Sequence, residues 1–319
     1  MKMNKTMPNQ RGTVELLNNA LTGRMRLYRK TLMAVLFAGF VVQSEASVYT
    51  IGARDTSMQI DLAGGISQWA IDGVNQLNLQ TFYYSVGSGP ATSIYTLGLP
   101  SATTITTNLP KTIVTLDATY ANSTLSVDTL FSLQSSPVGS GKATLAQTLT
   151  INNLSATTQV FHFYQYSDFD LGGVSGVQNV QFSSNGSGQY YQVVQTGSSG
   201  TTLNGVVAGV NGGTSVQSEV QAGWYNPEKF GLAGGTNVVT LNNTLAAGPD
   251  NVAYAYEWDA TLAAGGSIII SEIQTVVPEP SSVALAAFGL LALAWFRRQR
   301  PGGWRHGRGG RDLIFQEPS

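Results

Sequence analysis

The feature that most constrains the fold is an alternation of apolar and polar residues with a period of two across residues 47–277. In "TLSVDTLFSL" the residues Leu125, Val127, Phe131 and Leu133 fall on one side, and "TLAQTLTI" repeats the pattern with Leu145, Leu149 and Ile151. Successive side chains of a strand point to opposite faces, so this pattern predicts half-buried β-strands. Helical spacing of apolar residues is not sustained anywhere in the region, which therefore predicts an all-β domain.

Turn-forming stretches divide this region into many short strands. "INNLS", "VNGGTS" and "AAGPDN" combine Gly, Asn, Asp and Pro at a spacing of roughly ten residues. Short strands at this spacing predict a single large antiparallel β-sandwich, jelly-roll-like, over residues 47–276. The predicted strands lie at 48–52, 57–62, 66–71, 78–86, 112–119, 123–134, 143–152, 159–167, 178–184, 189–196, 202–209, 215–221, 236–241, 251–259 and 266–277.

Charge is distributed unevenly along the 319 residues. The net charge is −1, yet seven of the 17 Lys and Arg residues lie in residues 1–46 and six in 278–319, so the β-region is acidic. An acidic domain does not favour nucleic-acid binding. The chain has no cysteine, which excludes disulfides, thiolate metal sites and a cysteine nucleophile.

The first 46 residues predict a secretory signal peptide. A basic segment, 24–30, precedes the eleven apolar residues Leu32–Val42, and the small residues Ser44 and Ala46 occupy the positions that signal peptidase reads. We expect general export and cleavage after Ala46. The polar segment before the apolar run is long, so translation from Met25 is the alternative start.

A second apolar run predicts a short transmembrane helix near the C-terminus. Val283–Phe296 contains fourteen residues without a charge, which makes a helix of ~21 Å. By the positive-inside rule, the arginines that follow would remain in the cytoplasm and the acidic domain would be exported. A helix buried in the protein core is the alternative, but this run lacks the polar residues that such a helix interleaves.

The order of motifs at residues 277–300 resembles the tripartite PEP-CTERM sorting signal of Gram-negative bacteria. A Pro-Glu-Pro triplet precedes the apolar run, and a basic cluster follows it. The resemblance implies that exosortase, a membrane enzyme, cuts near the triplet after transient retention in the inner membrane. The Gly- and Arg-rich tail at 301–319 departs from the family, whose members usually end soon after the arginines. The residues of the predicted sorting signal are Val277, Pro278, Glu279, Pro280, Arg297, Arg298 and Arg300.

Two carboxylates at the end of an aromatic strand form a candidate site. Asp168 and Asp170 precede Gly172 and Gly173, and their spacing separates them by about 7 Å along a strand. Such oxygen ligands could hold Ca²⁺, but a complete calcium loop is missing, and solvated carboxylates at a strand end are the simpler interpretation. A glycosidase pair is a further alternative.

Histidine is too scarce to favour catalysis. The chain has only His162, within an aromatic strand, and His306, in the tail. No Gly-x-Ser-x-Gly elbow accompanies them, and we expect a histidine-based metal site to lack partner ligands. We therefore predict no enzyme activity, no cofactor and a half-buried strand position for His162.

Aromatic residues provide the remaining candidate. Tyr254, Tyr256 and Trp258 alternate along one predicted strand, and Trp224 adds a further aromatic residue after the predicted strand 215–221. Exposed aromatic platforms bind sugars in many β-sandwiches, although alternating aromatics also fill sandwich cores. The sequence thus predicts a non-enzymatic surface or extracellular-matrix protein associated with exopolysaccharide or biofilm. A carbohydrate-binding module and, less favoured, a glycan-active hydrolase are the alternatives.

Overall fold

The computed structural model of the chain describes residues 48–98, 100, 102–108, 110–185, 189–212, 216–226, 230–278, 289–295 and 298. The signal-peptide residues, including Ser44 and Ala46, lie outside these ranges. So do Glu279, Pro280, Arg297 and Arg300 of the sorting signal. The corresponding predictions stay predictions.

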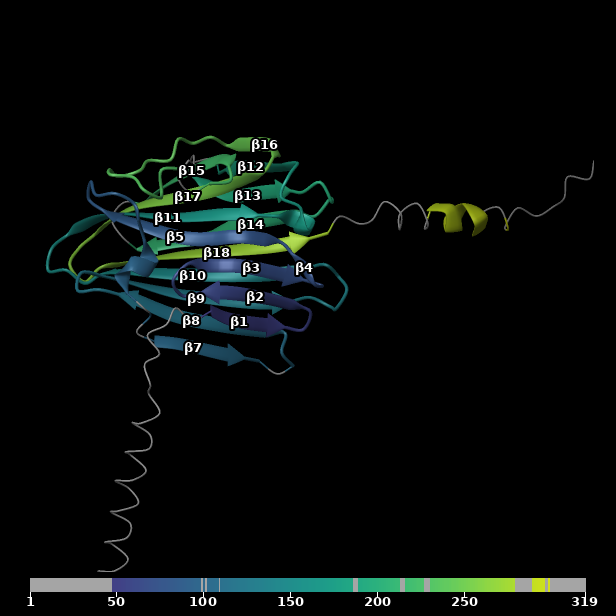
Figure 1. The fold of residues 1–319 in the computed structure, drawn as a ribbon, viewed down its shortest axis with the longest axis horizontal. Coiled ribbons are helices and arrows are strands. Elements are labelled where there is room, and N and C mark those ends of the chain that lie inside the picture. Colours follow the sequence, from purple (N-terminus) through teal and green to yellow (C-terminus); the bar gives the residue numbers. More distant parts are fainter. Residues whose placement is uncertain are drawn as a thin grey trace, which may run out of the picture. The chain divides into compact units, whose positions relative to one another are not determined.

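Two antiparallel sheets of nine strands each form the domain (Figure 1). The strand order of sheet A is β1 (Val48–Ala53), β2 (Thr56–Asp61), β3 (Gly65–Ile71), β5 (Leu77–Val86), β11 (Gln159–Phe169), β17 (Val252–Leu262) and β15 (Val216–Trp224), with β4 (Val74–Asn75) paired to β3 and β6 (Thr92–Ser93) paired to β5. The order of sheet B is β16 (Ala246–Asp250), β12 (Gln178–Ser184), β13 (Tyr190–Thr196), β14 (Thr202–Gly212), β18 (Ser267–Val277), β10 (Ala143–Asn153), β9 (Leu125–Ser135), β8 (Ile113–Ala121) and β7 (Ala102–Thr107).

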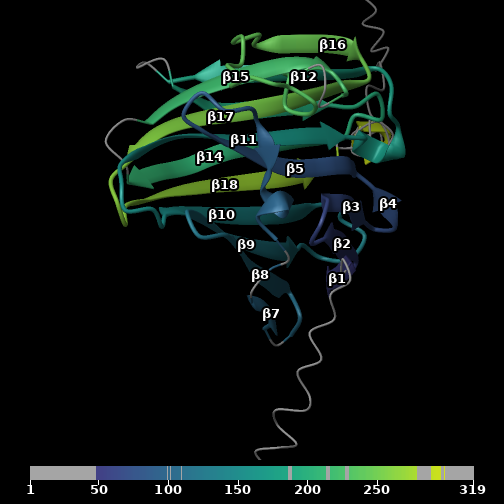
Figure 2. The ribbon, with the colours of Figure 1, turned by 60° about the vertical axis from the view of Figure 1, so that its left-hand side comes forward.

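The main core lies between the two sheets, which pack face to face (Figure 2). Strict alternation of buried and partly buried residues along β10 shows how the sequence pattern produces this core. Leu145, Leu149 and Ile151 are at most 1 % exposed, on the face that the alternation predicts. The prediction of an all-β sandwich is therefore confirmed.

Two details of the fold differ from the sequence-based expectation. Residues 236–241 are not a strand, because their backbone bonds to side chains of sheet A instead of to a neighbouring strand; Leu241 N, for example, donates to Glu257 Oε2 at 2.7 Å. The predicted turn "AAGPDN" contains strand β16, which pairs with β12.

Only part of the predicted transmembrane segment is described. Residues 289–295 are helical, and the large side chains Leu290, Leu291, Leu293 and Trp295 are 58–67 % exposed. Among the described residues, no helix has both the length and the apolar character that a membrane crossing requires. The transmembrane helix over Val283–Phe296 therefore stays a prediction.

A buried polar network crosses the middle of the core. Glu272 of β18 is 2 % exposed, and its carboxylate accepts hydrogen bonds from the amides of Gln147, Gln165 and Gln274. Gln165 belongs to sheet A and Gln147 to sheet B, so the carboxylate joins the two sheets. Burial raises the pKa of Glu272 to about 7, although the bonds from Gln165 and Gln274 oppose this shift.

This raised pKa predicts that the domain loses stability as the pH increases. The folded state retains the Glu272 proton between the unfolded pKa of about 4.3 and the folded value of about 7, so the free energy of unfolding falls across that window. We expect Glu272→Gln to flatten this dependence and to raise the free energy of unfolding at pH 8 by about 1–3 kcal/mol. Denaturant unfolding at several pH values measures it. Asp117→Asn, on the exposed side of β8, should keep the native profile, and an unchanged slope in Glu272→Gln would contradict the assignment.

Candidate functional site

Sheet A carries side chains in packed environments on both of its faces, and its outer face holds the candidate sites. Along β11, Phe161 and Phe163 point into the core between the sheets. The alternate residues Tyr164 and Tyr166 belong to a second apolar cluster on the other face, with Phe230, Leu232 and Leu241. We call the side that holds this second cluster the outer face of sheet A.

Polar residues lie on this outer face on either side of the two tyrosines. His162 precedes them and Asp168 follows them along β11. Six residues of strand separate these two by about 20 Å. The outer face therefore carries two distinct groups of polar side chains.

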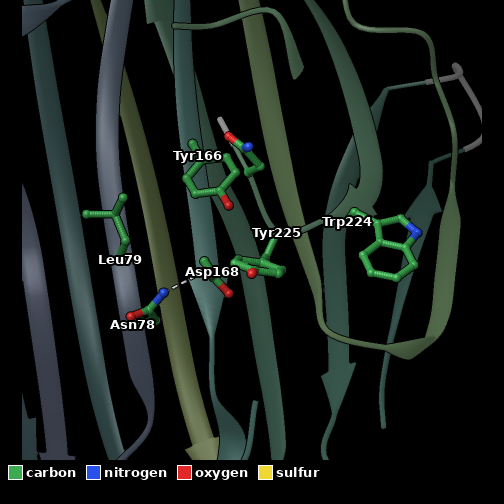
Figure 3. Close-up of a pocket in the computed structure, with 7 residues that line it drawn as sticks. Asn78, Leu79, Tyr166, Asp168, Trp224 and Tyr225 are labelled. Atoms are coloured by element: carbon green, nitrogen blue, oxygen red, sulfur yellow. Dashed lines mark hydrogen bonds between the residues drawn. The ribbon is translucent and has the colours of Figure 1, made fainter. Parts of the chain in front are cut away.

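A pocket of about 370 Å³ surrounds Asp168. Figure 3 shows the side chains of Tyr225 and Asn78 close to the Asp168 carboxyl group, with Trp224 to one side. Trp224 is 54 % exposed and Tyr225 is 46 % exposed. The lining residues come from β5, β11 and the end of β15, and they are Asn78, Leu79, Tyr166, Asp168, Trp224, Tyr225 and Asn226.

The polar groups at the base of this pocket have incomplete hydrogen bonding. Asn78 Nδ2 donates to Asp168 Oδ2 at 2.8 Å, whereas Asp168 Oδ1 and Tyr166 Oη are buried without a hydrogen-bond partner. Buried polar atoms without partners are rare and need an explanation. Burial is the main cause that raises the pKa of Asp168 to about 6; the Asn78 bond lowers it and the charge of Asp170 raises it.

The expectation of solvated carboxylates at this strand end is wrong for Asp168. Its side chain is buried, with 2 % exposure, because β11 continues to Phe169 and lies between β5 and β17. Burial also raises the pKa of Asp170. Within the described part of the chain, these two carboxylates do not belong to a group of three ligands that could hold a metal ion.

Of the two interpretations of the aromatic residues on β17, packing in the sandwich core is confirmed and an exposed platform is wrong. Tyr254, Tyr256 and Trp258 are at most 1 % exposed and pack in the core between the sheets. They contact one another and Phe182 of sheet B through ring pairs 5.3–6.0 Å apart. Only Trp224 of the four predicted aromatics remains accessible, and it lies in the pocket around Asp168.

The second polar group is centred on His162. Its Nδ1 lies 2.5 Å from Asp259 Oδ1 and 3.6 Å from Glu257 Oε1. Hydrogen bonding to Asp259, then to Glu257, raises the pKa of His162 to about 9. The expectation that His162 lacks partner ligands is wrong, because strand pairing between β11 and β17 brings Asp259 across from it.

A third carboxylate lies next to this group. Glu219 of β15 is directly opposite Glu257 in the strand register. Burial is the main cause that raises the pKa of Glu219, and the negative charges of Glu257 and Asp259 add to it. Glu219 Oε2 and Glu257 Oε1 are both buried without a hydrogen-bond partner.

Sequence reasoning missed the partners that complete both groups. Asn78 is 90 residues from Asp168, and His162 is 97 residues from Asp259, so local spacing contains no signal for either contact. Glu257 and Asp259 were identifiable as the polar face of β17. That His162 lies opposite Asp259 became known only from the order of the strands in sheet A.

Comparison with solved structures finds distant likenesses. A bacterial glucoamylase complexed with acarbose matches with a TM-score of 0.45 at 10 % identity; the match covers 78 % of this chain and 34 % of the glucoamylase, so this chain spans about a third of that protein. A putative aldose 1-epimerase from Escherichia coli K12 matches with a TM-score of 0.35 at 10 % identity, over 72 % of this chain and 98 % of the other. A galactose mutarotase-like protein from Lactobacillus casei ATCC 334 matches with a TM-score of 0.38 at 7 % identity, over 72 % and 100 %. TM-scores this low support no conclusion about this chain.

Comparison of sequences identifies the C-terminal region. No curated protein matches the chain. The family model of the PEP-CTERM protein-sorting motif matches residues 276–298. This range includes the Pro-Glu-Pro triplet, the apolar run and the first two arginines of the basic cluster. The motif implies export by a route that passes the membrane to the cell surface, with processing by exosortase. The chain is therefore a PEP-CTERM sorting-domain protein.

Proposed function

We propose that this protein is a non-enzymatic component of the cell surface or extracellular matrix, and that its β-sandwich binds carbohydrate in the pocket around Asp168. The observation that carries the proposal is the combination of exposed aromatic side chains with buried polar atoms that lack partners. Trp224 and Tyr225 offer apolar faces at the pocket, and Asp168 Oδ1 and Tyr166 Oη offer polar groups at its base.

The chemistry of this pocket suits a sugar. A sugar ring has apolar C–H faces that can lie on an aromatic ring, and it has hydroxyl groups at its edges. A hydroxyl can donate to the Asp168 carboxylate, and such charge-assisted hydrogen bonds are stronger than neutral ones. Pockets that bind small ligands typically combine aromatic walls with a few polar groups that fix orientation.

The position of the sorting motif is compatible with release of an intact sandwich. Strand β18 ends at Val277, directly before Pro278, and lies between β14 and β10 in sheet B. Cleavage near the Pro-Glu-Pro triplet would therefore leave every described strand in the released part. The sparse charge of the chain, 11 % Asp, Glu, Lys and Arg, suits a hydrated matrix without ionic attraction to polyanions.

Binding to glycans tests the proposed pocket. We expect the purified protein to bind on a glycan array or to exopolysaccharide extracted from the host, and Tyr225→Ala or Trp224→Ala to weaken binding about tenfold or more. The matched control is Tyr191→Ala, because Tyr191 is 40 % exposed and lies outside this pocket. Equal losses in Tyr225→Ala and Tyr191→Ala would contradict the assignment. Polysaccharide turnover that Asp168→Asn abolishes would instead favour a hydrolase.

Carbohydrate affinity should also depend on pH through Asp168. Above its pKa of about 6 the carboxylate is charged and accepts strongly from a sugar hydroxyl, whereas below it the neutral acid accepts weakly. We expect the affinity to fall as the pH decreases from 7.5 to 5. Asp168→Asn should bind more weakly at pH 7.5 and show no such decrease. Calorimetric titration of both proteins measures this difference, and a parallel pH profile in the two would refute the role of Asp168.

Deletion of Pro278–Pro280 tests the route to the surface. Without the triplet, exosortase lacks its recognition segment, so we expect the uncleaved protein to accumulate in the inner membrane fraction of a host with active exosortase. Deletion of Gly307–Gly309 in the tail removes the same number of residues and should leave sorting unchanged. Intact mass of the extracellular protein provides a second measurement. A mass that still includes residues 283–319 would contradict transient anchoring.

A further inference from the structure

We propose that His162, Glu257, Asp259 and Glu219 on the outer face of sheet A bind one divalent transition-metal ion, of which Zn²⁺ is the best-suited example. This site is separate from the proposed carbohydrate pocket and does not depend on it. The four residues belong to three adjacent strands, β11, β17 and β15.

Strand pairing places the four side chains in one compact group. Glu257 and Asp259 are two residues apart on β17 and therefore point to the same face. His162 is directly opposite Asp259, and Glu219 is directly opposite Glu257. Directly opposed side chains have Cβ atoms only about 4.5–5.5 Å apart. Both ladders thus converge on a single patch of the sheet.

The distances between ligand atoms are close to those around a bound metal ion. One ligand atom each from His162, Glu257 and Asp259 lies within 4.8 Å of the others, and His162 Nδ1 is 3.6 Å from Glu257 Oε1. Two ligand atoms at a tetrahedral zinc are about 3.4 Å apart. Small side-chain rotations would therefore bring the group into a coordination shell.

Glu257 provides an independent indication of a missing cation. Its side chain is 1 % exposed, and Oε1 lies beside His162 without a hydrogen-bond partner. Its second oxygen, Oε2, accepts from the backbone N–H of Leu241 at 2.7 Å, which fixes the orientation of the carboxylate. Metal ligands are typically held in place by such hydrogen bonds from neighbouring groups.

The charges of the group also favour a cation. Glu219 and Glu257 are like-charged residues directly opposite each other, which is a destabilising pair in a sheet. One imidazolium leaves a charge of −2 on a group with three carboxylates, whereas a divalent ion beside a neutral imidazole leaves only −1. His162 and Asp259 side chains are 16 % and 27 % exposed, so an ion can enter from solvent.

The ligand types select a transition metal over calcium. Imidazole nitrogen is a ligand for zinc, copper, iron and nickel, whereas Ca²⁺ prefers oxygen ligands only. Three carboxylates and one imidazole also accept Mn²⁺, but Zn²⁺ is expected to bind more tightly by the usual order of affinities.

Metal titration of the full chain tests this site. The protein, purified in detergent and treated with a chelator, is titrated with ZnCl₂, MnCl₂ and CaCl₂ by calorimetry, with bound metal counted by elemental mass spectrometry. We expect one Zn²⁺ per chain at this site, weaker Mn²⁺ binding and negligible Ca²⁺ binding. His162→Gln and Glu257→Gln should each reduce the Zn²⁺ affinity at least tenfold. His306→Ala, which removes the only other histidine, should leave this site intact.

Thermal unfolding separates metal binding from a purely structural role. Glu257→Gln relieves the opposed charges and keeps an acceptor for Leu241 N, so we expect its metal-free Tm to equal or exceed that of the native chain. Its Tm increase with Zn²⁺ should disappear. Zn²⁺ binding that survives in both His162→Gln and Glu257→Gln, or no Zn²⁺ binding to the native chain, would overturn the proposal.

Discussion

The structure depends on the packing of sheet A from both sides. Every residue at 163–169 of β11 and at 252–258 of β17 is buried, with successive side chains on opposite faces of the sheet. This requirement explains why β11 is rich in aromatic residues on alternate positions. It also means that any polar residue on these strands is held in a fixed environment by its neighbours, which is the condition for a preorganised site.

The segment over residues 230–241 completes this double packing. Phe230, Leu232 and Leu241 cover Tyr164 and Tyr166, while Val239 O accepts a hydrogen bond from Tyr164 Oη at 2.7 Å. The segment forms no strand because its polar backbone groups bond to side chains below it. The apolar side chains of this segment cover only the part of the outer face that holds the two tyrosines. The pocket around Asp168 and the group around His162 lie on the polar parts of the same face. The position of both sites therefore follows from how far this cover extends.

The sequence predicted what depends on local patterns. Alternation located the strands that build the core, such as β9 and β10, because their apolar side chains face one sheet only. The Thr-rich strand β7 lacked this signal, and β16 contains Gly and Pro, which normally indicate a turn. The aromatics of β17 were ambiguous because exposure depends on which sheet packs against them. Contacts such as Asn78 with Asp168 depend on strand order, which no local pattern contains.

The three buried carboxylates Glu272, Asp168 and Glu257 differ in how completely they are hydrogen-bonded. This difference distinguishes a structural role from a ligand-binding role. Both oxygens of Glu272 have amide partners, so this residue has all that burial requires and joins the two sheets. Asp168 and Glu257 each have one oxygen with a partner and one without. A purely structural role would favour replacing such residues with apolar ones, because an unpartnered buried oxygen costs about 1–3 kcal/mol. Both incomplete carboxylates lie on the outer face of sheet A, next to more exposed residues such as Trp224 and Asp259, and the complete one lies in the core. Among these three carboxylates, an unpartnered oxygen is therefore found only on the face on which the proposed sugar and metal would bind.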